Sequence, residues 1–422
     1  MALELAVDRY PDAADKRPIL IAGAGIAGLA AAIALAGNGR HVRVLESRAA
    51  ANEEGAGIQI GPNGVHALRH LGIADRLQRR AIQPTAITVM EGPTGRCLAR
   101  LPLTPHMQVS HGAPYWVTRR SDLHQALLST ARTLAGIEIA HGFRVDSIEA
   151  VGPAGAGGVR VRGQNGSWMA GAALVGADGL WSTVARTWLR APPLHFANRT
   201  AARALVPVAG LPPPFSEPVT GIWLGARAHL VHYPLGGELP AGAGSPVLNL
   251  VLVIAGGSQE DNWGTPIEAS VLLPSLDGWP EAVRQLVAQT KDWRRWSLMQ
   301  RAPLRSWCDG PVTVVGDAAH PVLPFLAQGA VLALEDAVTL GNAVAATPGG
   351  LAAAFRVYAA ARQARARKVQ RASQRNGQIY HLTGLAARAR NSALSWLPAE
   401  RLIGGYDWMY GYRCPDFIGA SI

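Results

Sequence analysis

The chain has 422 residues, of which 49% are hydrophobic and 16% charged, so it can bury a sizeable core and form two or three structural units. Glycine and proline are abundant but follow no period, which argues against a fibrous or disordered chain. The formal net charge of +11 is compatible with a nucleic acid, an acidic membrane surface or an anionic small molecule as partner.

Nothing near the N-terminus indicates secretion or a stable membrane anchor. Residues 1–17 lack the basic-then-apolar order of a signal peptide, and we expect 1–15 to form a flexible tail. The run 19–37 is apolar enough to resemble a membrane span, but its glycines and alanines fit a strand, a turn and a helix better. The three cysteines form no CxxC pair, which disfavours a redox motif or a cysteine-based metal site and fits a reducing cytoplasm.

The first motif is a glycine-rich turn. PILIAGAGIAGLAAAIALAGNGRHVRVLESR predicts a strand (19–22), the turn, a helix (about 26–37) and a second strand (42–46). The glycines, spaced as GxGxxG, allow a tight turn, close approach of a pyrophosphate and close packing of the helix on the strand; they are Gly23, Gly25 and Gly28. Glu46 ends the second strand at the place of an acid that binds ribose hydroxyls, which disfavours a 2′-phosphate on the bound dinucleotide.

Two features follow in the middle of the chain. The segment GPAGAGG (152–158) lies between two strand-like runs, so we interpret it as a hairpin loop and not as a second dinucleotide motif. ALVGADGLWSTVAR then predicts a buried strand ending in Asp178-Gly179, with Arg186 one or two helical turns later.

A second sheet is predicted from strand-like runs at 203–208, 221–235 and 247–257. In AHLVHYPL the side chains alternate between faces, so His229, Val231 and Tyr233 share one face while Leu230 and His232 share the other. Only one of the two histidines can therefore face a ligand on this sheet, and His232 is interpreted as a structural histidine.

The last third opens with VVGDAAHPVLPFLAQGAVLALEDA (314–337). A β-branched run ends in Gly-Asp, two prolines stiffen the loop, and Gln-Gly begins an apolar-periodic helix. A Pro-Gly-Gly break precedes a further predicted helix, which contains the basic segment RQARARKVQRASQR (362–375). No aromatic residues for base stacking are interleaved there, so we interpret this segment as a solvated helix face and expect no nucleic-acid partner.

In this order, GAGIAG with its acid, the DG motif and the GD motif resemble the group A FAD-dependent aromatic hydroxylases, the single-component flavoprotein monooxygenases. The segments 55–73 and 118–127 match linking segments of that family, and YDWMYGY (406–412) resembles the salicylate- and 3-hydroxybenzoate-hydroxylase-like branch. The resemblance covers nearly the whole chain.

The resemblance implies a mixed α/β fold with a Rossmann-like FAD-binding domain, a second β-sheet domain and C-terminal helices. The FAD-binding domain is expected to be discontinuous, made of 16–82, 110–195 and 306–345. The substrate-binding sheet is expected from 83–109 and 196–305, and the C-terminal helical region from 346–422.

The resemblance also implies non-covalent FAD, with NADH or NADPH as a transient reductant. Asp317 would bind the ribityl chain, Arg120 the phosphate or ribityl region, and Asp178 would link FAD indirectly to the nicotinamide cofactor. Arg48 could approach the adenosine or be solvated, and Arg186 could touch NAD(P)H or be structural. The full set of expected cofactor-binding residues is Gly23, Gly25, Ala27, Gly28, Glu46, Ser47, Arg48, Gly57, Ile58, Arg120, Val145, Asp178, Asp317, Pro321, Gly329 and Ala330.

For the substrate, the His-x-x-x-Tyr spacing resembles the branch in which both side chains flank a phenol. The expected catalytic residues are His229, Tyr233 and Gln328, and the expected substrate-binding residues are Arg203 and Pro324. Arg203 could bind a substrate carboxylate or be an ordinary strand-end arginine, and His229 could be purely structural. Relatives often have Arg after YPL, where this chain has Gly236, so the resemblance alone does not establish a carboxylated substrate.

The implied reaction is hydroxylation of a phenolic or heteroaromatic small molecule by O2 through a flavin C4a-hydroperoxide, with a histidine deprotonating the phenol. A flavin dehydrogenase or oxidase without oxygen insertion is the alternative within enzymes. A non-catalytic nucleotide-binding regulator or a basic nucleic-acid binder is the alternative outside them. The sequence is also compatible with a homodimer.

Overall fold

The computed structural model describes residues 17–49, 56–152, 157–236, 246–257 and 263–417, and the expected tail at 1–15 lies outside them. The first large sheet has six strands in the order β18-β19-β11-β1-β2-β7. All neighbours in it are parallel except β18 and β19. Its strands are β1 (Ile19–Ala22), β2 (Val42–Glu46), β7 (Ile137–His141), β11 (Ala173–Gly176), β18 (Cys308–Asp309) and β19 (Val312–Val314).

The predicted strand, turn and helix at the front of the chain are confirmed. All residues of β1 are buried, as expected for a strand covered on both faces. Helix α1 (Ile26–Gly37) follows the turn and packs against α9 (Gly329–Ala346), where Gly341 lets the two helices approach at Ala34. Helix α9 is long and apolar enough to cross a membrane, but 72% of it is buried inside the molecule, which makes it a core helix.

The second sheet has eight strands in the order β16-β17-β12-β15-β14-β13-β4-β5. The run 221–235 forms a hairpin of two strands and not one, because residues 225–227 make a turn. The strands are β4 (Ala86–Glu91), β5 (Cys97–Pro102), β12 (Leu194–Pro207), β13 (Thr220–Leu224), β14 (Ala228–Leu235), β15 (Val247–Ala255), β16 (Thr265–Pro266) and β17 (Arg294–Arg301).

Apolar side chains and short helices cover one face of this sheet. Trp223 of β13 packs on Trp279 and Phe215, with ring centroids 6.3 Å and 5.7 Å away. The helices in this layer are α7 (Ala269–Leu272), η2 (Leu273–Leu276) and α8 (Glu281–Gln289). The opposite face is therefore the one available to line a site.

Two small sheets complete the strands. A three-stranded sheet contains β8 (Val145–Ala150), β9 (Val159–Gly163) and β10 (Trp168–Gly171), and β3 (Gly57–Ile60) pairs with β6 (Trp116–Arg119). The antiparallel pairing of β8 and β9 agrees with the predicted hairpin, although residues 153–156 of its loop lie outside the described residues.

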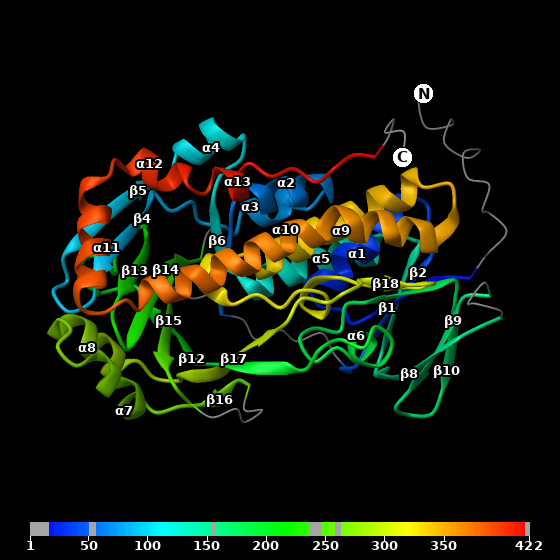
Figure 1. Cartoon of the computed structure of the whole chain (residues 1–422), viewed down its shortest axis with the longest axis horizontal. Helices are drawn as coiled ribbons and strands as arrows, with labels where there is room; N and C mark the ends of the chain where they lie inside the picture. The colour runs from blue at the N-terminus through cyan, green and yellow to red at the C-terminus, as the bar shows by residue number, and fades with distance from the viewer. Residues whose placement is uncertain (1–16, 50–55, 153–156, 237–245, 258–262, 418–422) are drawn as a thin grey trace.

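A long helix, α10 (Gly350–Tyr380), follows the predicted Pro-Gly-Gly break and runs beside α9 along the molecule (Figure 1). In this view the six-stranded sheet lies at one end of α10 and the eight-stranded sheet at the other. The remaining helices are α2 (Pro62–His70), α3 (Ala74–Gln78), α4 (His106–His111), α5 (Arg120–Thr133), α6 (Thr183–Thr187), η3 (Gly316–Ala318), η4 (Pro324–Leu326), α11 (Gly384–Trp396), α12 (Ala399–Gly404) and α13 (Asp407–Tyr410).

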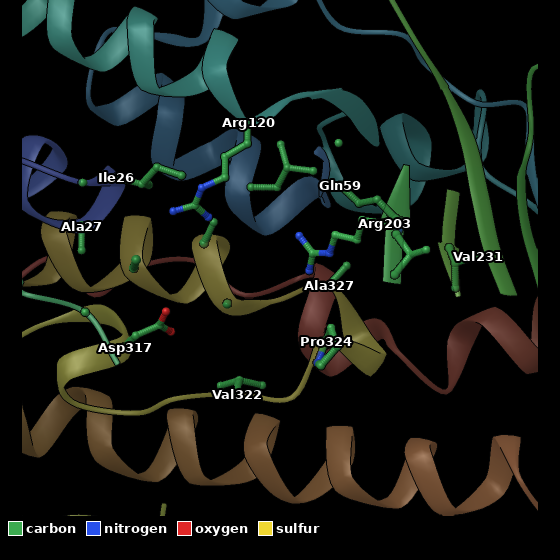
Figure 2. Close-up of a pocket in the computed structure, with 18 of the residues that line it drawn as sticks. Ile26, Ala27, Gln59, Arg120, Arg203, Val231, Asp317, Val322, Pro324 and Ala327 are labelled. Atoms are coloured by element: carbon green, nitrogen blue, oxygen red, sulfur yellow. The ribbon is translucent and has the colours of Figure 1, made fainter. Parts of the chain in front are cut away.

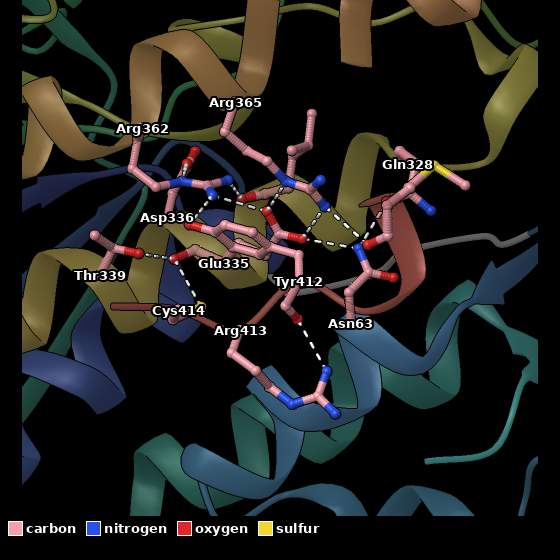
Figure 3. A network of polar contacts seen from close by, with 12 residues as sticks. Asn63, Gln328, Glu335, Asp336, Thr339, Arg362, Arg365, Tyr412, Arg413 and Cys414 are labelled. Carbon is pink, nitrogen blue, oxygen red and sulfur yellow. Dashed lines mark hydrogen bonds and ion pairs between the residues drawn. The ribbon is translucent and has the colours of Figure 1, made fainter. Parts of the chain in front are cut away.

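The basic segment 362–375 lies within α10, and its interpretation as a solvated face is wrong for two of its arginines. Arg362 and Arg365 are buried and form ion pairs with Glu335 and Asp336 of α9 (Figure 3). Burial of these charges is tolerated because each is paired and hydrogen-bonded. Arg371 and Arg375, farther along the same segment, are exposed.

Candidate active site

A cavity of about 290 Å³ lies between the glycine-rich turn, the Gly-Asp loop and the free face of the eight-stranded sheet (Figure 2). Segments far apart in the sequence meet there, because residues of α1, η3, α9 and β14 all line its wall. The expected site residues that line it are Gly25, Ala27, Gly57, Ile58, Arg120, Arg203, His229, Tyr233, Asp317, Pro324, Gly329 and Ala330.

The glycine-rich turn is shaped by close backbone contacts. A Cβ on Gly28 would lie 1.9 Å from the carbonyl oxygen of Gly23, whereas a Cβ on Gly25 would meet nothing within 4 Å. Gly28 therefore lets α1 pack tightly, and Gly25 leaves the N-terminal backbone of α1 open to the cavity. Glu46 fixes the turn, since its Oε2 accepts a hydrogen bond from the backbone N–H of Ala24 at 2.8 Å.

The Gly-Asp loop lies directly against this turn. A Cβ on Gly316 would come within 2.8 Å of the Cβ of Ala27, so the late motif and the early motif are in contact. Asp317 points its carboxylate into the cavity from the side opposite Arg120 (Figure 2). Its position inside the molecule raises the pKa of this carboxyl group, and the positive charges of His320 and Arg120 oppose that rise.

The start of α9 forms another wall. Gly329 and Ala330 line the cavity, and a Cβ on Gly329 would meet nothing within 4 Å. Ala327, just before the helix, has a left-handed backbone with φ of 52°, which costs an alanine about 1 kcal/mol or more. This turn directs the N-terminal N–H groups of α9 toward the cavity, where they favour negative charge.

The fourth wall is the sheet, and its register fixes which side chains meet. His229 of β14 pairs with Val253 of β15, and Val231 pairs with Val251, which in turn pairs with Arg203 of β12. All five of these side chains line the cavity.

The predicted alternation along β14 is confirmed. His232 lies on the other face of the sheet, with its ring centroid 4.9 Å from that of Phe215. Only His229 of the two histidines therefore faces the cavity.

His229 has a neighbour that sequence reasoning missed. Its Nδ1 lies 3.0 Å from Nε2 of His381, the residue that caps the C-terminus of α10, and the rings of Phe325 and Tyr380 pack around it. Burial, followed by electrostatic interactions with His381 and Arg199, holds the pKa of His229 well below 6.5, which favours the neutral imidazole at pH 7. No spacing in the sequence connects residues 229 and 381.

Arg203 is a half-buried cation on the cavity wall. Its Nε atom is buried without a hydrogen-bond partner. Among the described residues no carboxylate pairs with it, and its guanidinium lies 5.3 Å from the ring centroid of Trp296. Burial lowers the pKa of Arg203, and the nearby Tyr233 opposes that change. A buried charge of this kind is costly unless an anion offsets it.

Tyr233 packs closely against β3 at one side of the cavity. A Cβ on Gly57 would lie 2.5 Å from its ring, so only glycine allows β3 to approach. Asn249, opposite Tyr233 on β15, accepts a hydrogen bond from the backbone N–H of Gly57 at 2.8 Å. Burial raises the pKa of Tyr233, so its phenol stays protonated and can donate a hydrogen bond.

Several expected cofactor residues do not line the cavity. Asp178 caps the N-terminus of α6, accepting hydrogen bonds from the N–H groups of Thr183 and Val184 at 2.7 Å and 3.1 Å. Val145 lies in the core, and the carbonyl oxygen of Pro321 accepts a hydrogen bond from Gln370. The others outside the cavity wall are Gly23, Gly28, Glu46, Ser47 and Arg48.

Gln328 also points away from the cavity, which corrects its expected role as a substrate contact. Its Oε1 accepts a hydrogen bond from Nδ2 of Asn63 at 2.9 Å, and the same Nδ2 lies 2.8 Å from Glu335 (Figure 3). Asn63 thereby links Gln328 to Glu335 and so to the buried ion pairs between α9 and α10.

The cavity therefore defines a flavin-dinucleotide type of site: a glycine cradle, an acid and a helix N-terminus on one side, and a sheet with a histidine on the other. The sequence matches the FAD binding domain family over residues 16–373. The chain belongs to this family.

Relatives agree over nearly the full length. The chain is 35% identical to 3-hydroxybenzoate 6-hydroxylase of Polaromonas naphthalenivorans over 406 residues, 96% of this chain and 98% of the relative. It is 32% identical to 3-amino-4-hydroxybenzoate 2-monooxygenase PtmB3 of Streptomyces platensis over 402 residues, 94% and 97% of the two chains. Among solved structures it is similar to Klebsiella pneumoniae HpxO complexed with FAD and uric acid, with a TM-score of 0.79, 25% identity and coverage of 93% and 96%.

The protein is an FAD-dependent aromatic hydroxylase, a flavoprotein monooxygenase with NAD(P)H as reductant, and the alternative of an oxidase without oxygen insertion is set aside. The expected family and fold class are confirmed. The cavity fits FAD: the open backbone at Gly25 would take the pyrophosphate, Asp317 the ribityl chain, and Gly329 and Ala330 the isoalloxazine.

Proposed function

We propose that the substrate is a hydroxybenzoate-type molecule, a phenol that also carries a carboxylate. The observation that supports this most strongly is Arg203, a half-buried cation on the cavity wall with a buried, unpartnered Nε and no carboxylate partner among the described residues. A substrate carboxylate would offset its charge in a charge-assisted, two-pronged hydrogen bond. Both hydroxylating relatives named above act, by name, on benzoates with a hydroxyl group.

In this proposal the phenol faces His229 and Tyr233. The neutral imidazole accepts the hydroxyl proton and so raises electron density in the ring, while Tyr233, which keeps its own proton, donates a hydrogen bond. The valines of β14 and β15 exclude water from the ring carbons. Bound FAD supplies the activated oxygen, and the protein positions the substrate.

The proposal extends to residues around the cofactor. Glu46, with Ser47 and Arg48 beside it, is proposed to bind the adenosine ribose, and Asp178 to act indirectly through the start of α6. Pro324 is proposed to contact the substrate from the loop. The division into a discontinuous FAD-binding domain, a sheet domain and a C-terminal region is likewise proposed, supported by the two large sheets.

For assembly and location we propose a cytoplasmic homodimer. The three cysteines, Cys97, Cys308 and Cys414, are unpaired, which fits a reducing compartment. Exposed apolar side chains of α11, including Leu385 and Trp396, would suit an interface between two copies.

The experiment that tests the substrate class compares 3-hydroxybenzoate with its methyl ester and with phenol on the purified holoenzyme. Substrate affinity is measured from the change in flavin absorbance, and coupling from product formed per NAD(P)H consumed. Because Arg203 would pair only with the acid, Arg203→Met should weaken 3-hydroxybenzoate binding by about tenfold or more and leave the ester and phenol unchanged.

Arg227→Met is the matched control. Arg227 lies in the exposed turn between β13 and β14, where it pairs with Asp277, so its loss should leave all three affinities unchanged. Equal weakening of acid, ester and phenol in Arg203→Met would contradict the carboxylate assignment.

A further inference from the structure

His229 and His381 form a buried pair whose hydrogen-bond directions can be worked out. Nδ1 of His381 lies 2.6 Å from the carbonyl oxygen of Gly377, and a carbonyl oxygen can only accept a hydrogen bond. Nδ1 of His381 must therefore carry a proton. In a neutral imidazole the other nitrogen is then an acceptor, so Nε2 of His381 accepts from His229.

The same logic fixes His229. Its Nδ1, 3.0 Å from that acceptor, must carry the proton, and its Nε2 is left as the bare nitrogen. The hydrogen bond of His229 to a described residue is made by its Nδ1, and the residue lines the cavity. The hydrogen bonds from Gly377 through His381 thus leave Nε2 of His229, on a residue that lines the cavity, as the nitrogen with a free lone pair.

The end of α10 that carries His381 is held in place. Arg390 of α11 donates hydrogen bonds to the carbonyl oxygens of Ile379 and Tyr380 at 2.8 Å and 3.0 Å, which satisfies the last carbonyl groups of the helix. Rotation of His381 is further limited by its ring contact with His229, 4.9 Å between centroids.

We propose that His381 is a positioning residue that fixes the tautomer of His229, so that Nε2 is the atom that accepts the substrate's hydroxyl proton. This inference rests on the proposed role of His229 and names a residue outside the cavity wall as necessary for it. When the phenol O–H bond breaks, its proton forms the Nε2–H bond of His229, and the resulting imidazolium is stabilised by the Nδ1–H hydrogen bond to His381.

The charged and titratable groups around His229 and His381 favour the neutral form of both imidazole rings. Burial holds the pKa of His381 at about 4, and Arg199 and Arg390 act in the same direction. Arg199 of β12 also disfavours a charged His229, while Tyr380 of α10 packs on it with its own pKa raised by burial. Both pKa values are therefore lowered, which favours the neutral rings whose tautomers are defined.

Two variants separate positioning from mere packing. In His381→Gln the amide oxygen can still accept from Nδ1–H of His229, whereas His381→Phe keeps an aromatic ring but removes the acceptor. We expect His381→Phe to lower the rate of coupled hydroxylation by about tenfold or more and to divert turnover to hydrogen peroxide, while His381→Gln retains most of the coupled rate.

Tyr380→Phe is the matched control. It removes a hydroxyl that donates to the carbonyl oxygen of Phe325 at 3.2 Å but keeps the ring that packs on His229. Coupling and rate should stay unchanged in this variant, because the chain from Gly377 to His229 is intact.

A spectroscopic measurement tests the tautomer without turnover. Long-range ¹H–¹⁵N spectra of ¹⁵N-histidine-labelled, substrate-free holoenzyme should show His229, identified by its loss in His229→Ala, protonated at Nδ1 only. His381→Phe should abolish that pattern and His381→Gln preserve it. A proton on Nε2 in the parent enzyme, or an unchanged spectrum in His381→Phe, would overturn the inference; unchanged coupled turnover in His229→Ala would instead reject the proposed base.

Discussion

Two histidines three residues apart on one strand have different environments. His229 faces the cavity and has a nitrogen partner, whereas both ring nitrogens of His232 are buried without a hydrogen-bond partner among the described residues. Burial alone lowers the pKa of His232 to about 3. In the unfolded chain His232 would be protonated below about pH 6.5. In the folded state burial disfavours the protonated form, so the two states differ in protonation at lower pH.

This difference predicts how stability depends on pH. Above pH 6.5 His232 is neutral in both states and contributes nothing; as pH falls toward 3, only the unfolded state gains the proton, so the free energy of unfolding decreases. Between pH 7.5 and pH 5 the loss from His232 is about 2 kcal/mol. Denaturant unfolding of the holoenzyme should show that His232→Leu loses about 2 kcal/mol less than the parent enzyme over this interval. An identical pH dependence in the two proteins would contradict the buried, neutral assignment.

At the scale of single residues, the sequence predicted those features that depend on residues close by in the chain. The close packing predicted from Gly23 and Gly28 and the shared face of His229 and Tyr233, opposite His232, are both found in the structure. Gln328 was misplaced because its direction depends on Asn63, a residue 265 positions away. His381 was missed for the same reason.

At the scale of elements, the buried charges between α9 and α10 hold the cofactor loop. Asp336 accepts hydrogen bonds from the N–H of Gly316 at 2.9 Å and from Arg362 at 2.8 Å, and it lies 2.5 Å from His320 (Figure 3 shows its pairing with Arg362). These charges hold the pKa of Asp336 at about 2 despite its burial. The loop that presents Asp317 is thereby tied to the long C-terminal helix.

Removing one partner from this network should be costly. Arg362→Met leaves Glu335 and Asp336 buried with too little positive charge, and we expect the free energy of unfolding to fall by about 3–5 kcal/mol. Thermal or denaturant unfolding of FAD-saturated enzyme measures this. Arg371→Met, an exposed position on the same helix, is the control and should change stability by less than about 0.5 kcal/mol. Equal effects of the two substitutions would contradict a structural role for the buried pairs.

The order of residues in the sequence indicates this network, although the overall composition does not. Glu335 and Asp336 stand in an otherwise apolar helix, VLALEDAVTL, and a buried acidic pair requires basic partners. The spacing of Arg362 and Arg365 places both on one face of α10. Element types were predictable from such local patterns, but which helix faces another depends on the tertiary arrangement.

At the scale of the whole molecule, function depends on two sheets meeting at one cavity. The six-stranded sheet supplies the glycine turn and the Gly-Asp loop, and the eight-stranded sheet supplies Arg203, His229 and Tyr233. Helix α10 connects the two sheets (Figure 1), because Tyr358 hydrogen-bonds Val314 of β19 and the C-terminal cap His381 hydrogen-bonds His229 of β14. The order of the three motifs predicted this general arrangement through the family resemblance. The registers of β12, β14 and β15, which decide the distances within the site, had no counterpart in the sequence pattern.

The most direct measurement is a crystal structure of the yellow holoenzyme with 3-hydroxybenzoate bound under anaerobic conditions. The account predicts the flavin ring between Gly329 and the sheet, the carboxylate within hydrogen-bond distance of Arg203, and the phenol oxygen within hydrogen-bond distance of Nε2 of His229. A flavin ring outside this cavity, or a substrate whose hydroxyl group points away from His229, would contradict it.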